Sequence, residues 1–237
     1  MSHTVLALHY WAGAGRAFDA VRALLPADAS FHAPDLPGFG QQPAPPGFDY
    51  SVAAYADWVA GYARQKALGD FVLLGHSMGG KIALALAARR PAGLQGLVLL
   101  SPSPPPGELM TDEDRTAALA AHGLREEAEK TLQKTTGLPL TATQCQQVVA
   151  DNLRSSRAAW DAWLKVGARE DVCGLLVGLA VPCHLLVGAQ DRAITPAMQQ
   201  QLTLPHLPAG TRCVVVPGAG HLLPLEAPAA VAAALAL

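Results

Sequence analysis

The chain has 237 residues, of which 51% are hydrophobic and 15% charged, and its formal net charge is −2. That length allows one well-buried core, and a near-neutral chain without long runs of one sign lacks the basic patch of a nucleic-acid-binding protein. Its apolar stretches are interrupted well before the roughly 18 residues of a membrane span, and the N-terminal segment lacks the basic start of a signal peptide. We therefore expect a cytoplasmic monomer or homodimer with a small-molecule substrate and no nucleic-acid or membrane partner.

Short, near-continuous apolar runs alternate with helical patterns along most of the chain. Such runs are typical of strands that are covered on both faces, as in a parallel sheet. Strands are predicted over Val5–His9, Phe31–Pro34 (the weakest), Phe71–Gly75, Leu97–Ser101, Val181–Gly188 and Cys213–Val216. Helices are predicted over Ser51–Lys66, Gly80–Arg90, Pro196–His206 and Leu225–Leu237. The alternation predicts an α/β fold with helices on both sides of a sheet.

One region interrupts this alternation. The sequence SPSPPPG after the fourth predicted strand cannot continue a strand or a helix. From about Glu108 to Asp171 there are several helical stretches and no clear strand. We expect residues 1–102 and 173–237 to form the core domain, with residues 103–172 inserted as a helical cap, or lid.

The four cysteines do not indicate a metal site. Cys145, Cys173, Cys183 and Cys213 form no C-x-x-C pair and no Cys/His cluster with zinc spacing. Cys183 and Cys213 lie in predicted strands, so both are expected to be buried thiols. A disulfide between them stays open as an alternative, which a reducing cytoplasm would disfavour.

The strongest local pattern is G-x-S-x-G at Gly75–Gly79, directly between an apolar strand and an Ala/Leu-rich helix. This arrangement resembles the turn known as a nucleophile elbow. Gly75 and Gly79 lack the Cβ atoms that would clash in so tight a turn. The hydroxyl of Ser77 is then presented at a helix N-terminus, whose N–H groups favour a developing oxyanion. A chance Gly/Ser turn is the alternative, and the flanking strand and helix make it much less credible.

A serine hydroxyl needs a base, and the base needs an orienting acid. Asp191 follows an apolar strand, at the end of the sheet where such sites lie. His221 follows the last predicted strand in a glycine-rich loop. Taken alone, Asp191 could form a turn and His221 could be solvated. The order serine, aspartate, histidine accompanies this elbow, so we predict Ser77 as nucleophile, Asp191 as acid and His221 as base.

Together these features resemble the α/β-hydrolase superfamily, specifically a serine hydrolase or esterase with a G-H-S-M-G elbow, over nearly the whole chain. Asp35–Gly40 is similar to the family's D-x-P-G-x-G segment, and Glu226-Ala-Pro228 to the start of its final helix. The resemblance implies an α/β-hydrolase fold with a mostly parallel sheet of about six strands, because the usual first hairpin is missing. The plant methylesterase and hydroxynitrile-lyase branch shares this one feature.

The resemblance also implies an oxyanion hole. The family's His-Gly-x loop matches His9–Gly13, so the backbone N–H groups of Trp11 and Met78 would be the two donors. Tyr10 stands where the family usually has glycine, which puts the shape of this loop in question. Tyr10 is also a candidate substrate-binding residue, with core packing as the alternative.

Four further residues are candidates for a role in substrate binding or in support of the site, or for a surface ion pair. Trp160 and Trp163 are candidate substrate-binding residues, because residues three apart on a cap helix can share one face; packing within the cap is the alternative. His76, inside the elbow, is expected to support the site by packing. Lys81 opens the next helix and is expected to form an ion pair at the surface.

The predicted mechanism is a two-step acyl transfer through an acyl-enzyme, which needs no metal or organic cofactor. A small to medium, partly apolar carboxylic ester is the first choice of substrate, because an alkoxide leaving group needs little extra machinery. Fold alone does not choose the reaction. A C–C bond hydrolase or hydroxynitrile-lyase-like enzyme with the same triad stays open, as does a ligand receptor that retains the triad.

Overall fold

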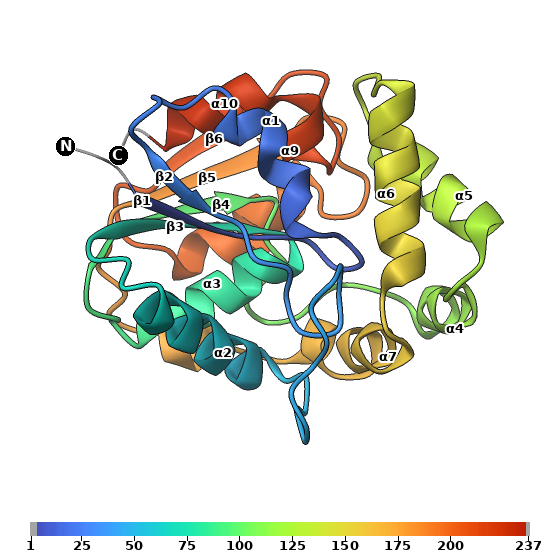
Figure 1. Cartoon of the computed structure of the whole chain (residues 1–237), viewed down its shortest axis with the longest axis horizontal. Coiled ribbons are helices and arrows are strands. Elements are labelled where there is room, and N and C mark those ends of the chain that lie inside the picture. The colour runs from blue at the N-terminus through green and yellow to red at the C-terminus, as the bar shows by residue number, and fades with distance from the viewer. Residues whose placement is uncertain (1–3, 236–237) are drawn as a thin grey trace.

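The structure, a computed structural model, describes residues 4–235 and contains a six-stranded, wholly parallel sheet (Figure 1). The strands are β1 (Thr4–Leu8), β2 (Ser30–His32), β3 (Phe71–His76), β4 (Leu94–Leu100), β5 (Cys183–Gly188) and β6 (Arg212–Val216). Their order in the sheet is β2-β1-β3-β4-β5-β6. The prediction of an α/β fold with a parallel sheet of about six strands is confirmed.

Helices cover both faces of this sheet (Figure 1). The α-helices are α1 (Asp19–Arg22), α2 (Val52–Gln65), α3 (Met78–Ala88), α4 (Asp112–Ala120), α5 (Arg125–Thr135), α6 (Ala142–Arg154), α7 (Arg157–Lys165), α8 (Pro196–Met198), α9 (Leu223–Glu226) and α10 (Pro228–Ala234). Residues of α2 and α3 pack in one core cluster with the strands, and residues of α1, α9 and α10 pack in a second.

The near-continuous apolar character of the strands follows from this two-sided burial. On β1, Leu6 and Leu8 belong to the core cluster under α2 and α3, whereas Val5 and Ala7 belong to the cluster on the other face. Successive side chains of a strand point to opposite faces, so a strand covered twice must be apolar at every position. All six residues of β3 are buried for the same reason.

Between β4 and β5 the chain forms helices and no strand, and the structure describes every residue of this stretch. Helices α4, α5, α6 and α7 lie together to one side of the sheet (Figure 1). Three of them begin at a side-chain cap: Thr111, Thr141 and Ser156 each accept a backbone N–H of the first turn. Within residues 4–235 no helix is both long and apolar enough to cross a bilayer, and the cytoplasmic location stays a prediction.

Two predicted helices are interrupted. The helix predicted over Pro196–His206 starts as α8, continues as a π turn (η4, Gln199–Thr203) and ends as a 3₁₀ turn (η5, Leu204–His206). The helix predicted over Leu225–Leu237 divides at Ala227, which has φ −140° and ψ 54°. Pro228 follows, and proline disfavours helical geometry in the residue before it. Residues 236 and 237 lie outside the described residues.

The prediction for the cysteines is half right. Cys183 on β5 is buried, whereas Cys213 on β6 is exposed, and neither forms a disulfide. Because β6 is the last strand of the sheet, one of its edges has no neighbouring strand and three of its five residues are exposed. The sequence pattern of β6 does not reveal that it lies at the edge.

Candidate active site

Ser77 occupies the turn between β3 and α3 in a strained conformation, with φ 53° and ψ −116°. The flanking glycines permit this turn. A Cβ on Gly75 would lie 2.6 Å from the Gly79 carbonyl oxygen, and a Cβ on Gly79 would lie 2.3 Å from that of Leu8. The carbonyl oxygen of Ser77 accepts the N–H of Ser103 at 2.9 Å, so the chain after β4 holds the turn in place. The side chains of the elbow thus occupy fixed positions at the carboxyl end of β3.

His221 and Asp191 form a buried pair at the carboxyl ends of β6 and β5. His221 Nδ1 lies 2.7 Å from Asp191 Oδ2, and the two side chains are 8% and 0% exposed. The other oxygen, Oδ1, accepts the N–H groups of Ala193 and Ile194, both at 2.9 Å. A carboxylate that accepts a hydrogen bond from Nδ1–H keeps the proton on Nδ1 and leaves Nε2 free to act as a base.

The electrostatics of the pair favour ionised Asp191. Burial alone would raise the pKa of Asp191, but the charge and hydrogen bond of His221 and the N–H of Ile194 outweigh it and lower this pKa. Burial alone would lower the pKa of His221, and Asp191 outweighs that effect, so the pKa of His221 is raised above its ordinary value. Each residue thus stabilises the charged form of the other.

His76 links this pair to the elbow. Its Nε2–H donates to the carbonyl oxygen of His221 at 2.8 Å, and the two rings lie 5.1 Å apart. Burial, together with the nearby His221, lowers the pKa of His76 to about 3, so the ring is neutral. Since His76 precedes Ser77 in the chain, the structure brings the three predicted catalytic residues to one edge of the sheet. The supporting role expected for His76 agrees with this contact.

The loop after β1 lies against the N-terminus of α3, because a Cβ on Gly79 would also lie 2.6 Å from the His9 carbonyl oxygen. His9 braces this loop: its Nδ1–H donates to the Tyr10 carbonyl oxygen at 2.7 Å, and its Nε2 accepts the Leu36 N–H at 2.9 Å. Within residues 4–235, the backbone N–H groups of Trp11 and Met78 donate to no protein acceptor. Both amides therefore remain available at this edge.

Tyr10 takes the place of glycine without backbone strain. The residue of this loop with a positive φ is Ala12, at 62°, and not Tyr10. The Tyr10 side chain is 8% exposed, and its ring lies 5.1 Å from that of His76. The side chain therefore lies next to the site.

Trp160 and Trp163, both on α7, have different surroundings, although both are buried. Trp160 packs its ring 4.1 Å from that of Trp11 and donates its Nε1–H to the Ala118 carbonyl oxygen at 3.0 Å. Trp163 packs into the main core cluster beneath α7, and a Cβ on Gly167 would lie 2.5 Å from its ring. Trp160 therefore contacts the loop after β1, whereas Trp163 joins the inserted helices to the core.

The expectation for Lys81 is wrong: its side chain is fully buried and forms no ion pair within the described residues. Its Nζ donates to the carbonyl oxygen of Gly167 at 3.3 Å. Burial lowers the pKa of Lys81 to about 8, against the partial compensation of Glu108 and other nearby acids. Lys81 lies one helical turn after Ser77. Its contact with Gly167 shows that the chain between β4 and β5 covers the side of α3 that the sequence suggested was exposed.

We expect Lys81→Met to stabilise the fold most at neutral pH. Between pH 8 and the unfolded value of about 10.5, the unfolded chain binds more protons at this lysine, so wild-type stability falls as the pH drops through that range. Methionine does not titrate and removes this loss, so the free energy of unfolding of the variant should exceed that of the wild type by up to about 3 kcal/mol at pH 7. Urea unfolding of both proteins at pH 7 and pH 10 measures it. A difference between them that does not change with pH would contradict the explanation.

Sequence reasoning missed two carboxylates near His221. Glu108 follows β4 and Glu226 ends α9, and the negative charges of both raise the pKa of His221. Burial raises the pKa of Glu108 itself. Glu226 was noted only as the start of the final helix. Glu226 follows His221 by only five residues, and this short separation is the sequence signal that could have placed its carboxylate near the histidine.

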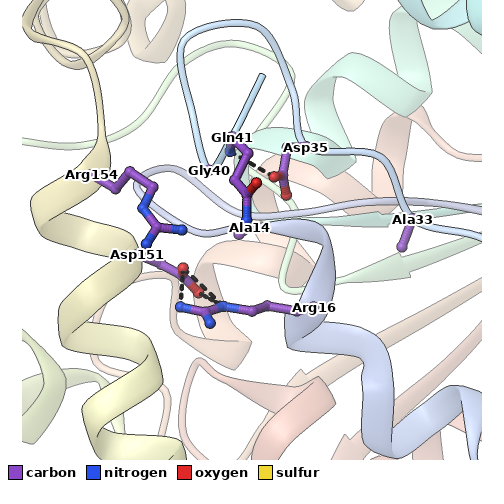
Figure 2. A pocket seen from close by; sticks show the side chains of 8 residues that line it. All are labelled: Ala14, Arg16, Ala33, Asp35, Gly40, Gln41, Asp151 and Arg154. Carbon is purple, nitrogen blue, oxygen red and sulfur yellow. Dashed lines mark hydrogen bonds and ion pairs between the residues drawn. The ribbon is translucent and has the colours of Figure 1, made fainter. Parts of the chain in front are cut away.

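A separate cavity of about 250 Å³ lies between the loops after β1 and β2 and helix α6 (Figure 2). Arg16 contacts both carboxylate oxygens of the buried Asp151, at 2.6 to 3.0 Å, and Arg154 extends from the same helix as Asp151. On the opposite wall, Asp35 accepts backbone N–H groups of Gly15 and Gln41. None of the predicted site residues lines this cavity.

Comparisons with known proteins identify the family of this chain. A model of the alpha/beta hydrolase family matches residues 5–234. A pimeloyl-[acyl-carrier protein] methyl ester esterase of Neisseria meningitidis serogroup B is 33% identical over 230 residues, covering 92% of this chain and 85% of the relative. A 2-succinyl-6-hydroxy-2,4-cyclohexadiene-1-carboxylate synthase of Enterobacter sp. (strain 638) is 31% identical over 241 residues, covering 97% and 88%. An esterase structure from Exiguobacterium antarcticum superposes with a TM-score of 0.88 at 19% identity. The superposition covers 98% of this chain and 90% of that chain, so the two share the fold. The chain belongs to the alpha/beta hydrolase family.

Proposed function

We propose that the protein hydrolyses a small to medium, partly apolar carboxylic ester through an acyl-enzyme on Ser77. The observation that carries the proposal is the buried His221–Asp191 pair, held by His76 beside a strained nucleophile elbow. Strain in a buried turn persists only where the surrounding structure imposes it, and such strain is concentrated at functional sites. The methyl ester esterase relative, similar over 92% of this chain, supports an ester as the substrate class.

In the proposed mechanism, His221 Nε2 takes the proton of Ser77 as its oxygen attacks the ester carbonyl carbon. The N–H groups of Trp11 and Met78 donate to the oxyanion of the tetrahedral intermediate. Asp191 keeps the proton on Nδ1 and stabilises the imidazolium. His221 then protonates the leaving alcohol and activates the water that releases the acid.

We further propose that residues 103–172 act as the cap over this site, with residues 1–102 and 173–237 as the core domain. The position of α4 to α7 beside the carboxyl edge of the sheet supports this division. Under this proposal Tyr10 and Trp160 line the acyl pocket, because both contact residues at the site, whereas Trp163 supports the cap from within the core.

A series of p-nitrophenyl esters from acetate to dodecanoate tests the proposed substrate class. We expect hydrolysis to peak at a short or medium chain, because the side chains around the site are large and buried. A rate that rises steadily up to dodecanoate would indicate an open site and contradict the proposed size of the acyl group. No hydrolysis of any member by folded protein would move the proposal away from simple esters.

We expect kcat/KM to rise with pH through one group, His221, whose pKa lies above the ordinary value of a histidine. His221 must be neutral to accept the proton of Ser77, and the charge of Asp191 raises the pKa of His221. Activity is therefore lost as the pH falls through that raised value. Initial rates at low substrate concentration between pH 5 and pH 9 measure the profile. A flat profile over this range would count against His221 as the base.

A second candidate is a lyase-type reaction that uses the same three residues as acid and base. A relative that is 31% identical over 97% of this chain is named as a synthase and not as an esterase, which favours keeping a second reaction class. Product analysis separates the candidates, because an esterase yields an acid and an alcohol, whereas a lyase divides its substrate without adding water.

A further inference from the structure

We propose that Glu226 is a positioning residue that fixes the catalytic histidine and ties it to one loop of the cap. Glu226 Oε2 accepts three backbone N–H groups: that of Gly220 at 2.8 Å and those of Gly137 and Leu138, both at 2.7 Å. Glu226 Oε1 accepts the N–H of Leu222 at 2.9 Å. One carboxylate therefore holds both neighbours of His221 and the first part of the loop of residues 136–141, which joins α5 to α6.

The two chain segments also meet directly. The N–H of His221 donates to the carbonyl oxygen of Thr135 at 2.7 Å. A Cβ on Gly137 would lie 2.4 Å from the Gly218 carbonyl oxygen, and a Cβ on Gly220 would lie 2.5 Å from that of Thr135. Glycine at positions 137 and 220 thus allows backbone to pack on backbone. The side chain of His221 is held by the core through Asp191, its backbone carbonyl oxygen by His76 of the core, and its backbone N–H by the cap.

Only an ionised carboxylate can satisfy all four N–H groups, because it accepts at both oxygens and donates at neither. A glutamine amide would turn its NH₂ toward either one or three N–H donors and would leave those donors unsatisfied. At this end, the cap cannot move away from the core without breaking the contacts that orient His221. The inference rests on the proposed role of His221 as the base.

The charge of Glu226 supplies a readout that distinguishes positioning from a general structural role. The groups that face His221 are Asp191 after β5, Glu108 after β4, Glu226 on α9 and the neutral His76 on β3. Removing the charge of Glu226 lowers the pKa of His221. In a plot of the Ser77 labelling rate against pH, the rising limb therefore moves to lower pH. Partial unfolding would instead lower the rate at every pH without moving the limb.

The experiment measures the rate at which a fluorophosphonate labels Ser77, from pH 5 to pH 9, in the full-length wild type and in Glu226→Gln. We expect the labelling rate of Glu226→Gln on the high-pH plateau to fall about 10- to 100-fold, the loss seen when hydrogen bonds that support metal-bound histidines are removed. We also expect the rising limb of its pH profile to move to lower pH. Circular dichroism confirms that the variant is folded. A folded Glu226→Gln variant with the wild-type rate and limb would overturn the proposal.

Gly137→Ala tests the cap side of the contact while keeping every charge. Its Cβ would press on the backbone at Gly218, so we expect slower labelling with the limb unmoved. Gly174→Ala is the matched control, because a Cβ there meets nothing within 4 Å, and should label like wild type. If Glu226→Gln does not fold, this pair decides: wild-type labelling by Gly137→Ala would overturn the coupling. Failure of the wild type itself to label would instead overturn the proposed function.

Discussion

Ser77→Ala is expected to abolish both ester hydrolysis and covalent labelling by a fluorophosphonate. The proposed mechanism has one nucleophile, and removing it leaves the oxyanion donors and His221 with no oxygen to activate. In serine proteases, loss of the nucleophile costs about 10⁶-fold in turnover. Activity-based labelling followed by mass spectrometry of the modified peptide measures the result directly. The fold should persist, because alanine meets the same backbone strain at φ 53° as serine does.

Ser103→Ala is the matched control for this prediction. Ser103 is buried, and it contacts the elbow through its backbone N–H, which donates to the Ser77 carbonyl oxygen and is kept in the variant. The control should label at close to the wild-type rate. Labelling that persists in Ser77→Ala and disappears in Ser103→Ala would assign the nucleophile to the chain after β4.

The parts of the fold that the sequence predicts are those for which local pattern and burial agree. Leu6 and Leu8 face one core cluster while Val5 and Ala7 face the other, so the apolar run of β1 is a direct consequence of a covered parallel strand. The tight turn at Ser77 is equally predictable, because it leaves no room for a Cβ on Gly75 or Gly79.

The errors arise where the answer depends on what lies opposite in space. Lysine is usually a surface residue, and only the contact of the Lys81 Nζ with the carbonyl oxygen of Gly167 reveals that this lysine is covered. Cys213 sits in an apolar run, and only the sheet order places its strand at an edge. Glu226 contacts both Gly220, which is near it in the chain, and Gly137, which precedes it by 89 residues, and no local pattern encodes such a meeting.

Asp191→Asn is expected to lower turnover by about 10⁴-fold, the loss known for the same change in a serine protease. Asp191 Oδ2 accepts the Nδ1–H of His221, while Oδ1 is occupied by the N–H groups of Ala193 and Ile194. Those two donors keep the remaining carbonyl oxygen of asparagine, so its NH₂ faces Nδ1. The imidazole then carries its proton on Nε2 and cannot accept one from Ser77.

The accompanying change in pH dependence gives this prediction a second measurement. The charge of Asp191 raises the pKa of His221, so its removal should move the remaining rising limb to lower pH. Asp151→Asn is the control, because Asp151 is also a buried, paired carboxylate but lies in the cavity beside Arg16. Turnover should fall at most severalfold there. Near-normal turnover in Asp191→Asn would assign the acid to Glu108, which follows β4 in the chain and whose charge also acts on His221. Glu108→Gln would then show the large loss instead.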